Sequence, residues 1–218
     1  MTDVWDDRAQ AYRESKTHAE GADLDLLVEW CEPGEGVKAL DVATGGGHVA
    51  RRLRDEGCDV TTVDQSPGMR PDVTTAAEHL PFADGSFDVV ASRIAPHHFS
   101  DIGRAVHEMA RVSNSLVVVE DTLWSSERHE QAETIRDPSH VRNYTELEWR
   151  RFLGDAGLEL EQIEYFDKIH PLQDWLERTG CQGKDAERVK ELLGDRMTPD
   201  GTAWSDRKLV LKARKSQR

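Results

Sequence analysis

The chain has 218 residues, 42 of them acidic and 28 basic, which gives a formal net charge of −14 at pH 7. This length suits one sizeable hydrophobic core, and we expect a single domain over residues 1–218. A surface this negative repels phosphate backbones and anionic lipids, and no run of 18 apolar residues occurs, so we expect neither nucleic acid nor a membrane as a partner.

The first 31 residues are predicted to form two helices, Asp3 to Lys16 and Ala22 to Cys31. The start of the chain is acidic and lacks the apolar stretch of a secretory signal, so we expect a cytoplasmic protein. The three cysteines are odd in number and have no C-x-x-C spacing. This pattern indicates scattered reduced thiols rather than disulfides or a metal site.

Strands and helices alternate from residue 37 onward. Predicted strands cover residues 37–42, 58–63, 86–91 and 116–119, and predicted helices cover residues 48–56 and 101–112. A capping box at Thr145 opens a further helix that Gly157 ends. The last predicted strands are residues 158–166 and 208–213. Continuous apolar strands that alternate with helices are typical of a doubly wound, mostly parallel α/β sheet.

Two segments, residues 121–143 and 168–206, interrupt this alternation, and the second contains a helix of its own. Both follow the carboxyl ends of predicted strands, where open α/β sheets bind ligands. We therefore predict that they act as lids or pocket walls beside a core of residues 37–120, with plain surface packing as the alternative.

The glycine-rich stretch LDVATGGGHVARRL, residues 40–53, fits two kinds of site. Residues 45–50 satisfy G-x-G-x-x-(G/A), and Asp64 follows near the offset that is typical of a nicotinamide dinucleotide site. A second frame is Asp41-x-Ala43-x-Gly45-x-Gly47, in which the acid at the strand end belongs to the motif.

Four segments in order decide between these frames: ALDVATGGG, VTTVDQSPGM, AEHLPFADGSFDVV and ARVSNSLVVVED. Together they resemble the class I S-adenosylmethionine-dependent methyltransferases, in the branch that includes the ubiquinone and menaquinone C-methyltransferases. The resemblance implies an enzyme with a Rossmann-like sheet of seven strands, the last of them antiparallel, with N-terminal helices and a helical insertion before that strand. It also implies S-adenosylmethionine as the cofactor. The modest insertions favour a small organic molecule as the methyl acceptor.

The first set of site residues that this resemblance implies surrounds the glycine loop. Asp41 engages the ammonium group of the cofactor, a role for which a nicotinamide site has no need. Gly45 and Gly47 lack Cβ, so the backbone from Ala43 onward can lie against the methionine portion and the ribose. Asp64 is expected to accept hydrogen bonds from both ribose hydroxyls.

The second set lies further along the chain. Gln65 is expected at the edge of the adenine, and backbone groups of Ala77 and Glu78 are expected to reach its ring nitrogens. Arg93 follows a strand at the place where the methyl-bearing end of the cofactor is expected. Tyr12 is predicted to close over the cofactor from the N-terminal helix.

Three departures from the family pattern accompany these residues. Ala76 stands where relatives often have an aspartate that binds the adenine amine, and residues 113–115 read Ser-Asn-Ser where Pro-Gly-Gly is common. The chain between Asp64 and Glu78 is also short, so we expect the second crossover helix to be nearly absent.

Methyl transfer is an in-line displacement, so the main task of the enzyme is alignment, and a base is needed only if the acceptor must lose a proton. His97 and His98 follow the fourth strand and are the candidate bases, with packing or capping as the alternative. No third metal ligand lies at a useful spacing, so we expect no metal. Four further side chains are predicted near the pocket: His140, Arg142, Asn143 and Tyr144.

Several alternatives stay open at this stage. A catalytically inert cofactor- or partner-binding domain of the same fold and an NAD(P)-dependent oxidoreductase are the other functions considered. The protein is expected to be a monomer or a homodimer. Adaptation to high salt and ordinary acidic solubility both explain its charge, and the methyl-accepting atom is left open among O, N and C.

Overall fold

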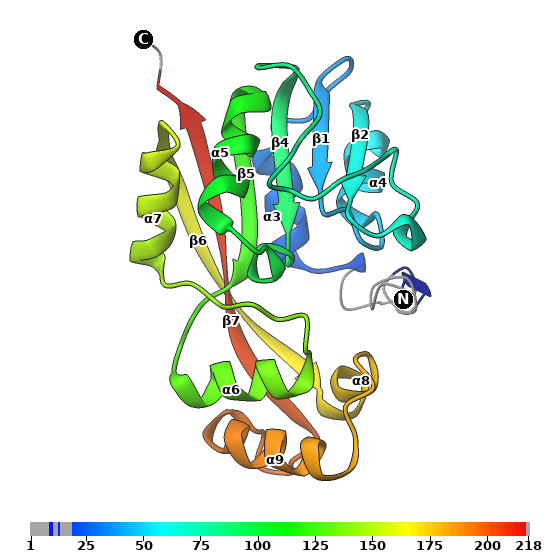
Figure 1. Cartoon of the computed structure of the whole chain (residues 1–218), viewed down its shortest axis with the longest axis vertical. Helices are drawn as coiled ribbons and strands as arrows, with labels where there is room; N and C mark the ends of the chain where they lie inside the picture. The colour runs from blue at the N-terminus through cyan, green and yellow to red at the C-terminus, as the bar shows by residue number, and fades with distance from the viewer. Residues whose placement is uncertain (1–8, 11–12, 14–18, 217–218) are drawn as a thin grey trace.

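The computed structural model describes residues 9–10, 13 and 19–216, in which one sheet has seven strands in the order β3-β2-β1-β4-β5-β7-β6 (Figure 1). The strands are β1 (Lys38–Val42), β2 (Asp59–Asp64), β3 (Val73–Thr74), β4 (Phe87–Arg93), β5 (Ser113–Thr122), β6 (Leu158–Pro171) and β7 (Ala203–Lys215). β7 runs antiparallel to both of its neighbours, β5 and β6, and the other pairs are parallel. The predicted sheet with an antiparallel last strand is confirmed.

Helices cover both faces of this sheet (Figure 1). One face packs against α3 (Ala22–Trp30) and α4 (His48–Asp55), and the other packs against α5 (Ile102–Val112) and α7 (Glu146–Asp155). Along β5, Val117 and Val119 enter the core with α5 and α7, whereas Leu116 and Val118 enter the core with α3 and α4. Side chains of a strand alternate between faces, so a continuous apolar run fills both cores at once.

The extended ends of β6 and β7 carry a lower lobe, separate from the upper lobe that the rest of the sheet and its covering helices form (Figure 1). The lower lobe contains α6 (Glu127–Arg136), α8 (Leu172–Glu177) and α9 (Gly183–Leu193). Its own apolar core gathers side chains from all three helices and from β7, among them Trp175, Val189, Leu193 and Trp204. The predicted helical insertion before the last strand is therefore present, and α6 adds a helix inside residues 121–143 that the sequence pattern did not indicate.

The two late strands are longer than their apolar pattern indicates. β6 and β7 stay paired as far as Pro171 and Ala203, beyond the predicted ends at Phe166 and Lys208. In this ribbon Ile169 is exposed while His170 and Trp204 are buried. Side chains in this two-stranded arm alternate between exposed and buried positions, and some of the buried ones are polar. The arm therefore lacks the continuous apolar run that marks a central strand.

The connection from β2 to β4 is as short as predicted. A single 3₁₀ turn, Pro67–Met69, and the two-residue strand β3 stand where a crossover helix would lie. Most of the predicted first helix, Asp3 to Lys16, falls outside the described residues. Of the helices in the described part, none combines the length and the apolar character needed to cross a membrane.

Candidate active site

A cleft of about 170 Å³ lies at the carboxyl ends of β1, β2 and β4. It brings together most of the predicted site residues: Asp41, Ala43, Gly45, Asp64, Gln65, Ala77, Glu78, Arg93 and His98. Ala76, the position where relatives often have an aspartate, also lines it, and the remaining lining residues were not predicted from the sequence: Thr44, Gly46, His48, Val49, Met69, Thr75, Ile94, Ala95, Phe99 and Ser100. Gly47 lies next to the cleft as the residue that caps α4, and Tyr12 is outside the described residues.

The backbone of the cleft adopts left-handed conformations at two strand ends. Ala43 follows β1 with φ 56°, and Ile94 follows β4 with φ 50°. Such values are uncommon outside glycine and a genuine outlier for a β-branched residue, and strain of this kind concentrates at functional sites. In the loop itself, Gly45 (φ 51°) and Gly47 (φ 72°) adopt the same region without a side-chain penalty. A Cβ added at Gly45 would have no atom closer than 3.9 Å, so open space adjoins this backbone.

Asp41 is buried at the end of β1, where it supports the glycine loop. Its carboxylate accepts hydrogen bonds from Thr44 Oγ1 at 2.6 Å and from the Ala50 backbone N–H at 3.2 Å. Burial raises the pKa of Asp41 to about 6, although both hydrogen bonds favour the charged form. A cation that entered the cleft beside Asp41 would therefore draw off its proton.

Asp64 ends β2 and holds the other side of the same loop. Its two carboxylate oxygens accept hydrogen bonds from the backbone N–H groups of Gly45 at 2.9 Å and Ser66 at 3.0 Å. A carboxylate oxygen can accept two hydrogen bonds, so hydroxyl groups of a ligand can share this acceptor. Asp41 and Asp64 thus flank the glycine loop from two adjacent parallel strands.

The far end of the cleft has an apolar wall. Met69, Ala76, Ala77 and Phe99 line it. The Glu78 carboxylate does not serve as an open acceptor here, because it accepts hydrogen bonds from Ser100 Oγ at 2.8 Å and the Asp101 N–H at 3.1 Å. Burial opposes its ionisation, but these hydrogen bonds outweigh burial and the pKa of Glu78 is lowered.

Arg93 lines the cleft and is at the same time the centre of a buried ion network. Its guanidinium lies 2.5 Å from Asp23 of α3 and 2.5 Å from Glu120 of β5, and Lys168 of β6 lies 2.6 Å from Asp23. Burial raises the pKa of Glu120 to about 7 in spite of Arg93. The network joins four elements directly beneath the cleft. A contact between Arg93 and a ligand stays a prediction.

His97 and His98 are placed differently. His98 lines the cleft and also a second cavity of about 40 Å³, whereas His97 lines the second cavity alone. His97 Nδ1 lies 2.5 Å from Asp121 Oδ1, and both side chains are buried. Because a carboxylate only accepts, we assign the proton to Nδ1, which leaves a lone pair on Nε2. Asp121 was visible in the sequence only as an acid at the end of a predicted strand.

The local partners of His98 differ from those of His97. Its Nδ1 lies 3.0 Å from the carbonyl oxygen of Ser139. Burial, together with the neighbouring His97, lowers the pKa of His98 well below its usual value. Its ring is therefore neutral near pH 7 and is held by a backbone group rather than by a carboxylate.

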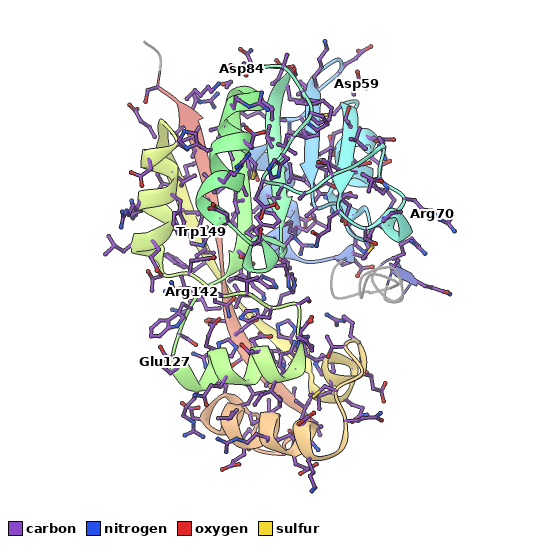
Figure 2. All side chains as sticks on the ribbon, in the orientation of Figure 1. Asp59, Arg70, Asp84, Glu127, Arg142 and Trp149 are labelled. Atoms are coloured by element: carbon purple, nitrogen blue, oxygen red, sulfur yellow. The ribbon has the colours of Figure 1, made fainter. Side chains whose placement is uncertain are left out.

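The four side chains predicted from residues 140–144 line neither of these two cavities. His140 Nε2 lies 2.7 Å from Glu130, and Tyr144 packs against Trp149 and Phe152. Arg142 pairs with Glu148 and lies where the two lobes meet (Figure 2). No cluster of three or more potential metal ligands occurs in the part of the chain that the structure describes.

The strand order, the antiparallel β7 and a glycine-lined cleft between acids at the ends of β1 and β2 define a class I methyltransferase fold. Residues 40–116 match the family model described as a methyltransferase domain. An uncharacterised methyltransferase of Bacillus subtilis, YcgJ, is 30% identical over 208 residues, which cover 85% of this chain and 81% of that protein.

Two further methyltransferases are similar to this chain. A proposed methyltransferase of Bacillus halodurans has a crystal structure with a TM-score of 0.80 and 27% identity, covering 90% of this chain and all of that one. A demethylmenaquinone methyltransferase of Beutenbergia cavernae is 41% identical over 112 residues, 45% of each chain. The chain belongs to the methyltransferase family and is an enzyme of that class.

Proposed function

We propose that this enzyme transfers the methyl group of S-adenosylmethionine to a small organic acceptor. The observation that carries the proposal is the pair of buried carboxylates, Asp41 and Asp64, on either side of a left-handed glycine loop. When bound, the cofactor supplies an activated methyl group on a sulfonium that leaves as a neutral thioether.

The residues present fit this cofactor in chemistry and in order. Asp41 suits the ammonium of the methionine portion, and the first turn of α4 offers backbone N–H groups to its carboxylate. Asp64 suits the ribose hydroxyls. The apolar wall that includes Met69 and Phe99 suits the adenine ring. The buried acid at the end of β1 would repel a pyrophosphate, which argues against NAD or NADP.

We propose that His97 acts as the base when the acceptor must lose a proton. His97 Nε2 would take the proton from the acceptor oxygen or nitrogen, and the electron pair left on that acceptor atom would be the nucleophile for the methyl group that the bound cofactor supplies. Asp121 holds the Nδ1–H and stabilises the imidazolium that results. His98 lines both cavities.

We propose that residues 121–143 and 168–206 form the acceptor-binding wall, because α6, β6 and α8 contribute side chains to the second cavity. We also propose that the enzyme is cytoplasmic. Its charge of −14 supports action on a small molecule and not on nucleic acid. A monomer or a homodimer is proposed.

Calorimetric titration tests the cofactor. We expect S-adenosylmethionine and S-adenosylhomocysteine to bind with dissociation constants of about micromolar magnitude, and NAD and NADP to give no heat. In the Asp64→Ala variant the affinity for S-adenosylhomocysteine should fall by about ten- to over a hundred-fold, because a charge-assisted hydrogen-bond acceptor is worth about 1.5–3 kcal/mol.

Matched variants complete this test. Asp59→Ala, at the exposed start of the same strand, should bind S-adenosylhomocysteine like the wild type. Tight binding of NAD with no response to S-adenosylhomocysteine would overturn the proposed function. Unchanged affinity in Asp64→Ala would show that Asp64 supports the glycine loop and does not bind the cofactor. Radiolabelled methyl transfer to candidate acceptors separates the active enzyme from an inert binding domain.

Cofactor binding should also release a proton near pH 6. The free carboxyl group of Asp41 has a pKa of about 6 because it is buried, and the cofactor's ammonium would favour its charged form. Affinity should therefore rise with pH up to about 6 and level off above it, with a slope of at most about tenfold per pH unit. Titrations at pH 6 in two buffers of different ionisation enthalpy measure the proton directly.

The Asp41→Asn variant is the control for this proton. It should bind the cofactor more weakly and give the same heat in both buffers, since its amide cannot titrate. Equal heats in both buffers for the wild type would show that Asp41 does not change its protonation state on binding.

A further inference from the structure

The second cavity draws its lining from both lobes of the molecule. His97 follows β4, Arg136 ends α6, His170 belongs to β6, Trp175 to α8 and Lys208 to β7. We propose that this cavity holds a carboxylate of the methyl acceptor, an anchoring group separate from the atom that receives the methyl. The inference rests on the proposed function, because it names the class of substrate that the same enzyme would take.

The charge of the lining is the first observation. Four cationic residues contribute to it, Arg136, Lys168, Arg178 and Lys208, against two acidic ones, Glu133 and Asp206. This is the reverse of the whole chain, in which acids outnumber bases.

The two carboxylates of the lining each already contact a cationic side chain and a histidine ring. Asp206 contacts Lys208 Nζ at 2.7 Å and His170 Nε2 at 3.1 Å, and Glu133 lies 3.5 Å from both Arg136 and His129. They therefore offer an incoming anion no isolated negative charge. Lys208 and Lys168 are likewise held by Asp206 and Asp23, so the attraction for an anion comes from the two arginines of the lining.

The guanidinium of Arg136 is the second observation, because it is buried and poorly satisfied. Its side chain is 8% exposed, yet its contacts with Glu133, Asp137 and the Trp175 carbonyl oxygen are all 3.5 Å long. Among the residues that the structure describes, its Nε has no hydrogen-bond partner. Good N–H···O bonds lie near 2.9 Å, and an unmatched buried donor is costly.

The guanidinium carbon of Arg136 lies 4.3 Å from the centroid of the Trp175 ring, and this cation–π contact restrains the guanidinium. A planar, oriented guanidinium is the group that recognises a carboxylate through two parallel hydrogen bonds. Arg136 is therefore positioned to bind such an anion.

His170 adds an unmatched acceptor to the same cavity. Its Nε2 faces Asp206, so the proton belongs there, and the buried Nδ1 has no hydrogen-bond partner in the described part of the chain. Burial lowers the pKa of His170, so its ring is neutral and Nδ1 carries a lone pair. An acceptor molecule with a hydroxyl group beside its carboxylate would satisfy Arg136 and His170 together.

The size and position of the cavity agree with a compact group. One water needs about 10–15 Å³, so about 40 Å³ suits the few non-hydrogen atoms of a carboxylate and its neighbour. Ile94 and His98 line both cavities. A molecule anchored at Arg136 would therefore extend past His97 toward the cofactor cleft.

Acetate and acetamide test this assignment, since they share shape and differ in charge. Saturation-transfer NMR at constant ionic strength should give a dissociation constant of about millimolar magnitude for acetate and binding at least about tenfold weaker for acetamide. Arg136→Gln and Arg178→Gln should each weaken acetate about fivefold or more. Arg188→Gln, an exposed arginine of α9 that pairs with Glu191, should leave acetate binding unchanged.

Each titration is run with and without saturating S-adenosylhomocysteine, so that failure of the cofactor proposal is seen separately from failure at this cavity. Arg178 is only partly buried, so its variant keeps the test valid if Arg136→Gln does not fold. Equal binding of acetate and acetamide would overturn the proposal, and so would acetate binding that survives in both cavity variants. Inorganic phosphate that binds more tightly than acetate, with the same variant dependence, would overturn the choice of a carboxylate.

Discussion

Replacing His97 by alanine is expected to lower kcat by about 10²–10⁴ while the affinity for S-adenosylmethionine stays unchanged. His97 Nδ1 is held by the buried carboxylate of Asp121 at 2.5 Å, so Nε2 is the atom proposed to accept the proton, and His97 lines the second cavity. The measurement is the kcat of both proteins with an identified acceptor.

Asp121→Asn keeps the size of the side chain but removes the charge that stabilises the imidazolium. We expect kcat to fall by about 10² or more, again with unchanged cofactor affinity. His98→Ala should lose less, because the neutral ring of His98 is held by a carbonyl oxygen. His107→Ala, an exposed histidine of α5, is the matched control and should match the wild type. Near-normal kcat in His97→Ala would eliminate base catalysis and leave alignment alone.

Replacing Arg93 by methionine is expected to destabilise the protein by about 3–5 kcal/mol, because it removes the cation that is hydrogen-bonded to the buried Glu120 and leaves the buried Asp23 with Lys168 alone. Asp23 and Glu120 each lie 2.5 Å from the guanidinium, and both side chains are almost fully buried. Urea unfolding followed by circular dichroism measures the loss. Adding Glu120→Gln to this variant should recover part of it, since the second substitution removes the charge that was left without its cation.

The stability of the wild type should rise as the pH falls through the range in which Glu120 takes up its proton. The pKa of Glu120 in the folded protein is about 7, above its ordinary value of 4.5, so the folded state takes up a proton more readily than the unfolded state. Stability from this group is therefore gained as the pH falls from about 7 toward 4.5. Arg188→Met, at an exposed pair, should stay within about 0.5 kcal/mol of the wild type. A change below about 1 kcal/mol in Arg93→Met would contradict the structural role.

The order of the main strands and helices followed from the sequence alone. Local periodicity shows whether a segment is apolar on one face or on both. From Lys38 to Thr122 this periodicity is enough to predict the alternation of strands and helices. The carboxyl ends of β1 and β2 could also be predicted from the sequence, because an acid directly after an apolar run marks the end of a buried strand. Asp41 and Asp64 therefore came together at the cleft without any knowledge of distant contacts.

The tertiary structure decided the partners of the charged side chains. Arg93 and Asp23 are 70 residues apart, Lys168 and Asp23 are 145 apart, and His97 and Asp121 are 24 apart. No sequence period relates such positions, because their contact depends on how separate elements pack across the sheet. The length of the β6–β7 arm and the second cavity depend on the same packing. The sequence by itself therefore determined the sheet and the glycine cleft, whereas the choice between His97 and His98 required the folded chain, in which burial and a buried carboxylate act together.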